Sequence, residues 1–245
     1  MARRQVIDPQ VRAEVVRLYG NVCWLNLPGC THVGREDDHI VPFHHGGKDT
    51  VANIRRACKH CNASRMDRVL SGYGATLHMV IGPPEAGKTT FVAEHAAADA
   101  LVLDFDRLAS TIMPSVDVRH ERPEALVSAA QGAWQGCYNK LARLAEPVEV
   151  WVVKSIPRSR RHPQMLDEWI ALDYHIHVID PGAQTVFDRL ESDDRPEGAR
   201  LVARQWYALH LSQRLIDARQ DKRHEQLAAL GLRSSPSGGF ERPEW

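Results

Sequence analysis

The chain has 245 residues, of which 43% are hydrophobic and 25% charged, as is usual for a globular protein of one large or two small domains. Its formal net charge is zero, and no run approaches 18 consecutive apolar residues, which argues against a membrane-spanning helix. The first residues contain no long apolar segment and no cleavage site, so we predict no signal peptide. Four of the five cysteines lie within residues 23–61, which favours a metal site in a reducing compartment, and we expect a cytoplasmic protein.

The N-terminal part predicts a short helix followed by loops. Asp8 and Pro9 are helix-start signals, the following valines have helical spacing, and Gly20 is a stop signal. Residues 21–57 contain Gly, Pro and Asp throughout and are expected to be mainly loops with short extended runs. A second helix is predicted over residues 61–70.

Two glycines and small polar residues at 71–76 mark the predicted domain boundary, which gives domains of residues 1–72 and 76–245. Beyond it, apolar strand-like runs alternate with helical stretches. This alternation predicts an α/β domain with a parallel sheet. The predicted strands are 77–82, 100–106, 148–156 and 173–180, and a long helical region follows at 198–232.

The first group of chemically informative residues is a set of four cysteines. Two pairs, Cys23 with Cys30 and Cys58 with Cys61, can supply four thiolates to a structural zinc ion. A module of about 70 residues with many loops buries little apolar core, so a metal that holds it together is physically reasonable.

The residues around these cysteines resemble the HNH endonuclease family over roughly residues 20–68. The resemblance rests on Asp38 and His39 followed by Ile and Pro, a Gly pair at 46 and 47, Asn53, and a Cys-x-x-Cys-Asn-x-x-Arg run that ends at Arg65. It implies a zinc-stapled ββα-metal module with endonuclease activity and a nucleic-acid partner, DNA or RNA. A zinc-ribbon binding module without catalysis is the alternative.

By this resemblance, His39 is expected to be the general base that deprotonates a water molecule, and Asn53 to orient the segment that carries it. Asp38, His39 and Asn62 are the expected ligands of a catalytic Mg²⁺ or Mn²⁺ at the scissile phosphate. Asn62 occupies a position where the family often has His, which leaves the metal preference open.

Basic residues are unevenly distributed along the chain. Residues 1–75 contain eleven Lys and Arg against seven Asp and Glu, whereas the remainder contains twenty against twenty-four. This asymmetry favours contact between the N-terminal part and a polyanion. We expect five side chains to contact the DNA backbone, which gives affinity without sequence information: Arg55, Arg56, Lys59, Arg65 and Arg68.

The second group is the run GPPEAGKT, which fits the P-loop pattern G-x-x-x-x-G-K-[ST] between a predicted strand and a predicted helix. Backbone N–H groups and the helix N-terminus are expected to bind the phosphates of ATP or GTP, Lys88 to reach the β and γ oxygens, and Thr89 to bind Mg²⁺. The predicted nucleotide-binding residues are Gly82, Gly87, Lys88, Thr89 and Thr90.

The next predicted strand ends in LDFDRL, where Asp104 and Asp106 alternate and are expected to point the same way beside the phosphates. This domain resembles small P-loop kinases, specifically the polynucleotide kinase group. The resemblance implies that Asp104 takes the proton from a 5′-hydroxyl and that Arg107 contacts phosphate. Two alternatives stay open for this pair. Asp106 can be the base, with Asp104 near the Mg²⁺ water shell, or the pair can be a Walker B-like element of an ATPase. Three arginines are candidates for a lid over the transferring phosphate: Arg158, Arg189 and Arg195.

The two resemblances together predict a bifunctional enzyme that processes nucleic-acid ends. An HNH endonuclease would be fused to an ATP-dependent polynucleotide 5′-hydroxyl kinase, a pairing suggestive of bacteriophage DNA repair in a bacterial host cytoplasm. The alternatives are an HNH nuclease coupled to a P-loop ATPase and a small-molecule kinase with an accessory zinc module.

Overall fold

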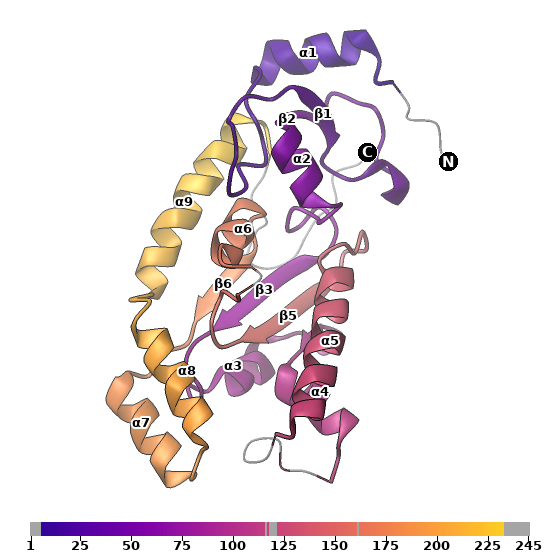
Figure 1. Ribbon diagram of the computed structural model, residues 1–245. Helices are drawn as coiled ribbons and strands as arrows, with labels where there is room; N and C mark the ends of the chain where they lie inside the picture. The colour runs from indigo at the N-terminus through magenta and orange to yellow at the C-terminus, as the bar shows by residue number, and fades with distance from the viewer. Residues whose placement is uncertain (1–5, 116, 118–121, 161, 233–245) are drawn as a thin grey trace.

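The structure is a computed structural model that describes residues 6–115, 117, 122–160 and 162–232. Figure 1 shows α1, β1, β2 and α2 at one end of an elongated molecule, a sheet flanked by helices in the middle, and α7 with α8 at the other end. The helix α9 runs along one side and reaches the N-terminal module.

The first helix forms as predicted. In α1 (Pro9–Tyr19), the Asp8 carboxylate accepts a hydrogen bond of 2.8 Å from the backbone N–H of Gln10, and Pro9 occupies the first turn, where its missing N–H costs nothing. Gly20 ends the helix with a φ of 70°, a left-handed conformation that favours glycine.

The N-terminal module continues with a hairpin and a helix. Strands β1 (Glu36–His39) and β2 (Ile54–Ala57) pair antiparallel, with a short 3₁₀ helix (Phe43–His45) in the connection. Helix α2 (Lys59–Arg65) follows and is shorter than predicted, because Met66 and Asp67 adopt positive φ angles of 48° and 63°. The order β1, β2, α2 agrees with the predicted ββα module.

The central sheet confirms the predicted parallel α/β layer. Its four strands lie in the order β4-β5-β3-β6 and all pair in parallel. Leu77, Met79 and Val152 point to one face and join a core with α5 and α6, whereas Val80 and Trp151 point to the other and pack with residues of α3. The strands are β3 (Thr76–Ile81), β4 (Leu101–Leu103), β5 (Glu149–Lys154) and β6 (His175–Val178).

Helices on both faces complete the C-terminal part, and one sequence prediction is corrected there. The single helical region expected at 198–232 is two helices, because His210 has a φ of 50° and Ser212 caps a new helix through Leu215 N–H. In the described part of the chain, no helix has both the length and the apolar character needed to cross a membrane. The helices are α3 (Lys88–His95), α4 (Phe105–Ile112), α5 (Glu124–Leu141), α6 (Met165–Ala171), α7 (Ala183–Ser192), α8 (Glu197–Tyr207) and α9 (Gln213–Ala229).

The predicted boundary segment is buried between the two parts of the chain. Ser71 is fully buried, and its N–H donates to Leu172 O at 3.0 Å. Farther along, the buried Arg223 of α9 donates to Ala171 O at 3.0 Å and to Trp24 O at 2.9 Å. The N-terminal module and the sheet therefore share one continuous hydrophobic core.

Candidate functional site

The four predicted zinc ligands come together in the N-terminal module. The sulfur atoms of Cys23, Cys30, Cys58 and Cys61 all lie within 4.8 Å of one another, and all but Cys30 are buried. Tetrahedral zinc at about 2.3 Å from each sulfur needs S···S separations of about 3.8 Å, so a small adjustment accommodates the ion. A hydrogen bond from Cys61 lowers the pKa of Cys23, in the direction of the thiolate that zinc binds. The donor set fits structural zinc.

His39 ends β1 and faces a carboxylate from the following loop. Its Nε2 lies 2.7 Å from Asp49 Oδ1, and both side chains are about 20% exposed (19% and 20%). Phe43 of the 3₁₀ helix approaches the imidazole edge-on, with ring centroids 6.0 Å apart. The pair is therefore fixed in place yet open to solvent on one side.

Asn53 holds the loop that connects His39 to Asp49. Its side chain is buried and makes three hydrogen bonds to this loop: Oδ1 accepts from Val41 N–H at 2.9 Å, and Nδ2 donates to Val41 O and Lys48 O at 3.1 Å each. Gly47 is needed here, since a Cβ at that position would lie 1.8 Å from Val41 O. Asn53 therefore fixes the shape of the loop between His39 and Asp49, whereas its role in orienting a catalytic base stays a prediction.

The two remaining predicted metal ligands lie where α2 packs along β1. Asp38 Oδ2 accepts hydrogen bonds of 2.9 Å from both Trp24 Nε1 and Arg65 Nη1. Asn62, one turn before Arg65 on α2, donates from Nδ2 to Glu36 Oε2 at 2.7 Å. Within the ranges that the structure describes, Asp38 Oδ1 and Asn62 Oδ1 accept no hydrogen bond, so two hard oxygen donors of the kind that Mg²⁺ prefers are available.

The prediction that five basic side chains contact DNA is largely wrong, because four of them are bound inside the protein. Arg55 is 1% exposed, stacks 3.8 Å over the Tyr19 ring and donates to Leu230 O. Arg65 is 2% exposed and binds Asp38 and the backbone of His39. The other members are Arg68, paired with Glu168 at 2.7 Å; Arg56, paired with Asp37; and Lys59, which is exposed.

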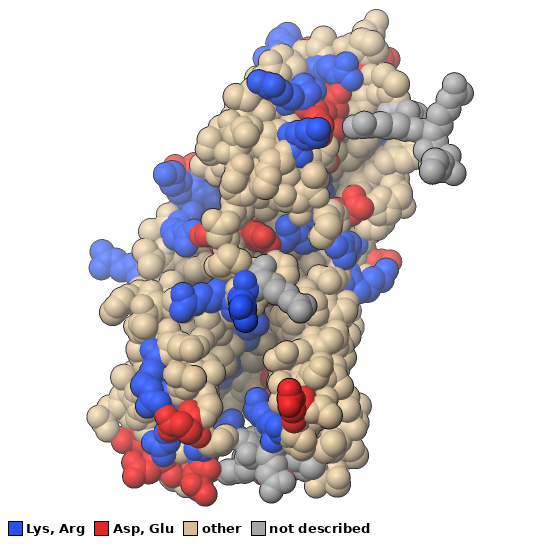
Figure 2. All heavy atoms as spheres, in the orientation of Figure 1, with Lys and Arg blue, Asp and Glu red and all other residues tan. Residues whose placement is uncertain are grey.

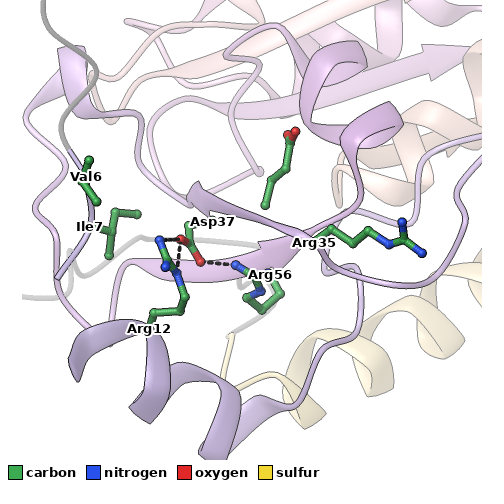
Figure 3. A pocket seen from close by; sticks show the side chains of 7 residues that line it. Val6, Ile7, Arg12, Arg35, Asp37 and Arg56 are labelled. Carbon is green, nitrogen blue, oxygen red and sulfur yellow. Dashed lines mark hydrogen bonds and ion pairs between the residues drawn. The ribbon is translucent and has the colours of Figure 1, made fainter. Parts of the chain in front are cut away.

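Arg56 belongs to a network that attaches α1 to the hairpin. Asp37 accepts from Arg56 across the strand pair and from Arg12 of α1 at 2.6 Å (Figure 3). These residues line a cavity of about 510 Å³ together with Val6, Ile7, Arg35 and Glu36. Arg35 is exposed and points away from the Asp37 network (Figure 3), so it is a basic side chain that can reach a phosphate backbone.

In the C-terminal part of the chain, residues 82–87 connect β3 to α3. Gly82 has a φ of 157°, and a Cβ there would lie 2.1 Å from Ile179 O, so only glycine fits. Lys88 is buried and donates to Pro83 O at 2.6 Å, and burial lowers its pKa to about 8. The loop lies at the carboxyl end of β3. The helix α3, which follows β3, packs on one face of the sheet, whereas α6, which follows the neighbouring strand β5, packs on the other. Ligands of open parallel sheets usually bind where successive connections change face in this way.

Asp104 and Asp106 do not alternate on a strand, which corrects the predicted geometry. The strand β4 ends at Leu103, and Asp104 caps α4 by accepting from the N–H groups of Asp106 at 2.8 Å and Arg107 at 3.3 Å. The other Asp104 oxygen accepts from Thr89 Oγ1 at 3.1 Å. Asp106 pairs with Arg122 at 2.8 Å, and burial raises its pKa.

Two of the three lid candidates reach the loop at 82–87. Arg195 is buried, and its Nε lies 3.1 Å from the Glu85 carboxylate; its Nη1 has no hydrogen-bond partner among the described residues. Arg189 donates to Glu85 O at 2.9 Å, whereas Arg158 is exposed. Figure 2 shows the molecule hollowed in this region, with Lys and Arg side chains on the walls of the hollow. Thr90 and Arg107 are exposed nearby in sequence, on α3 and α4.

Residues 23–68 match the HNH endonuclease family, and this stretch contains the four cysteines and all four predicted catalytic-centre residues. Residues 23–68 therefore form an HNH endonuclease domain within the N-terminal module. Among solved structures, the chain is similar to the tunicamycin resistance protein of Deinococcus radiodurans, with 15% sequence identity and a TM-score of 0.34, over 66% of this chain and 99% of that one. No curated protein matches the chain.

The sequence did not point to three side chains that contact the predicted nuclease residues. Trp24, Glu36 and Asp49 contact Asp38, Asn62 and His39, respectively. The position of Glu36 could have been predicted, since alternation along the strand Glu36–His39 brings Glu36 to the same face as Asp38. Nothing in the sequence pairs Asp49 with His39, because a loop makes that contact.

Proposed function

We propose that the protein is a bifunctional nucleic-acid enzyme that combines a metal-dependent HNH endonuclease with a P-loop polynucleotide 5′-hydroxyl kinase. The observation that carries the nuclease half is the His39–Asp49 pair inside the HNH domain, held by the buried Asn53. The kinase half is supported by Thr89 and Asp104 in contact beside the loop at 82–87.

In the nuclease reaction, His39 acts as the general base. The bond to Asp49 keeps the proton on Nε2 and leaves Nδ1 as the acceptor for a proton of the attacking water. The hydroxide oxygen bonds to phosphorus as the P–O bond to one nucleotide breaks. A divalent cation on Asp38 and Asn62, when bound, neutralises charge on the phosphate and the leaving oxygen.

In the kinase reaction, the two aspartates take separate roles. Asp104 contacts Thr89, the residue expected to bind Mg²⁺, and therefore belongs to the metal side of the site. The Asp106 carboxylate is 46% exposed and its pKa is raised, so it is the better placed of the two to accept a proton from a 5′-hydroxyl. The γ-phosphoryl group moves from ATP to the deprotonated oxygen, and ADP leaves. Of the two interpretations of the sequence, this assignment favours the one in which Asp106 is the base and Asp104 lies near the Mg²⁺ water shell.

Plasmid nicking tests the nuclease half. With zinc-loaded protein and Mg²⁺ or Mn²⁺, His39→Ala is expected to abolish nicking and to retain DNA binding. The matched control is His162→Ala, which removes an exposed histidine outside the module. Nicking by His39→Ala at the wild-type rate would overturn the assignment.

Transfer of label from γ-labelled ATP tests the kinase half. We expect label on a 5′-hydroxyl oligonucleotide and none on its 5′-phosphate twin, with Asp106→Asn reducing transfer by about 100-fold while ATP still binds. Label released only as free phosphate would reject the kinase and leave a nuclease joined to an ATPase. Label on neither strand nor water would point to a small-molecule acceptor.

A further inference from the structure

The carboxylate of Glu36 accepts a hydrogen bond from the Asn62 amide, and the nuclease reaction described above gives Glu36 no role. We propose that Glu36 is a positioning residue, which fixes the Asn62 side chain so that its carbonyl oxygen, and not its NH₂ group, faces the catalytic cation. The proposal rests on the nuclease function proposed above.

The packing of α2 on β1 supplies the first step. Glu36 and Asp38 are two residues apart on β1 and so share one face of the strand. Asn62 and Arg65 are three residues apart on α2 and share one face of the helix. Each side chain of the helix bonds to one of the strand, Asn62 to Glu36 at 2.7 Å and Arg65 to Asp38 at 2.9 Å.

The chemistry of the amide supplies the second step. A carboxamide has a donor end and an acceptor end, and a half-turn about its last torsion exchanges them. A carboxylate accepts only, so Glu36 pairs with the NH₂ end and would repel the oxygen end of Asn62. The oxygen therefore points away from Glu36. Of the two ends of the amide, only the oxygen can ligate Mg²⁺ or Mn²⁺, so the orientation that Glu36 selects is the one that binds metal.

A carboxylate near a cation site can also act as a ligand or through its charge, and variants separate these roles. In Glu36→Gln, the new amide can pair with either end of Asn62, so the orientation is lost while the shape is kept. In Asn62→Asp, both ends are oxygens and orientation no longer matters. An orienting Glu36 is therefore needed beside the native Asn62 and dispensable in the Asn62→Asp background, whereas a ligand or a charge is needed in both backgrounds.

The experiment is a titration of free Mn²⁺ by electron paramagnetic resonance on four zinc-loaded proteins: wild type, Glu36→Gln, Asn62→Asp and the double variant. Plasmid nicking is measured on the same samples. We expect Glu36→Gln to weaken Mn²⁺ binding by about tenfold when Asn62 is present, the usual effect of a residue behind a ligand, and by less than about twofold in the Asn62→Asp background. The control is Glu14→Gln on α1, where the carboxylate is 41% exposed and pairs with Arg17, and it should change neither reading.

Zinc content and thermal unfolding establish that each variant is folded. Equal loss of Mn²⁺ affinity in both backgrounds, or none in either, would overturn the role of Glu36 while wild-type nicking stands. Wild-type protein that neither binds Mn²⁺ nor nicks DNA would overturn the nuclease function itself, and the role of Glu36 with it.

Discussion

Nε2 of His39 lies 2.7 Å from Oδ1 of Asp49, although the two residues are ten positions apart and joined by a loop. The short distance depends on the buried Asn53, which ties Val41 and Lys48 together by hydrogen bonds inside that loop. A carboxylate behind an imidazole selects one tautomer and stabilises the cation that forms when the ring accepts a proton. Asp49 is therefore expected to act through His39 and not on the substrate.

Replacing Asp49 by Asn keeps a hydrogen-bond acceptor for Nε2 but removes the negative charge. We expect the nicking rate at saturating DNA to fall by about 100-fold, because the imidazolium formed in the transition state loses its partner. The dissociation constant for DNA should stay within about twofold. The measurement is single-turnover nicking beside fluorescence anisotropy of a labelled duplex.

Asp67→Asn is the matched control for this change. Asp67 also faces a histidine of the module, with 3.9 Å to His44, but both side chains are more than half exposed (58% and 57%). Exposed pairs contribute little, so its nicking rate should equal that of wild type. A similar loss of nicking rate in both variants would mean that Asp49 affects nicking only through the overall surface charge and not through its contact with His39.

Features fixed by spacing were predictable from the sequence, whereas features fixed by tertiary pairing were not. The cysteine pairs, the strands β3 to β6 and the loop at 82–87 follow from residue spacing and apolar periodicity. The strand β1 has no apolar residue, since its sequence is EDDH; it pairs with β2, and Arg12 and Arg56 neutralise Asp37. The charge of Arg55 and Arg65 led us to expect them on a surface that contacts DNA, but both side chains bind carbonyl groups in the interior.

Removing zinc is expected to destabilise both parts of the protein together. Cys23, Cys58 and Cys61 belong to the same core as Leu77 and Trp169, so losing the metal releases packing on both sides. We expect one zinc per chain by elemental analysis, and a single unfolding transition that moves to lower temperature with a zinc chelator or in Cys58→Ser.

Cys137→Ser is the control for this experiment, because Cys137 is exposed on α5 and is not part of the cluster. Its transition should coincide with that of wild type. Two separate transitions after chelation, with the later one unchanged, would show that the sheet does not depend on the metal site.

The carboxylate of Glu85 is expected to compete with nucleotide for the cationic groups around the loop at 82–87. It lies 3.1 Å from Arg195 Nε, and the nearby Lys88 is also buried. Triphosphate must displace Glu85 or be repelled by it. We therefore expect Glu85→Gln to tighten ATP binding severalfold and Lys88→Ala to abolish it, measured by calorimetry. The control is Glu94→Gln, an exposed residue on α3; weaker binding in Glu85→Gln would contradict the competition.

A group of histidines on the sheet predicts loss of stability in mild acid. The imidazole of His78 stacks on Trp151 at 4.2 Å and on His175 at 4.8 Å, and its Nδ1 lies 3.0 Å from Nε2 of His177, a contact that needs one neutral acceptor. Burial lowers the pKa of His78 to about 3 and that of His177 to about 4, and it lowers the pKa of His175 as well. One carboxylate, Glu149, lies 3.6 Å from His78 and does not offset the burial.

The sign follows from comparing the folded and unfolded states of His78 and His177. Unfolded histidines titrate near pH 6.5, so below that pH the unfolded chain binds protons that the folded chain refuses. The free energy of unfolding is therefore retained above about pH 6.5 and falls as the pH drops toward 4, by up to about 2.7 kcal/mol per pH unit for two histidines. Urea unfolding between pH 7.5 and 5 measures this slope. His78→Phe, which keeps an aromatic ring on Trp151 but cannot titrate, should reduce it by about half, whereas His162→Ala, at an exposed position, should leave it unchanged. An unaltered slope in His78→Phe would assign the acid sensitivity to other groups.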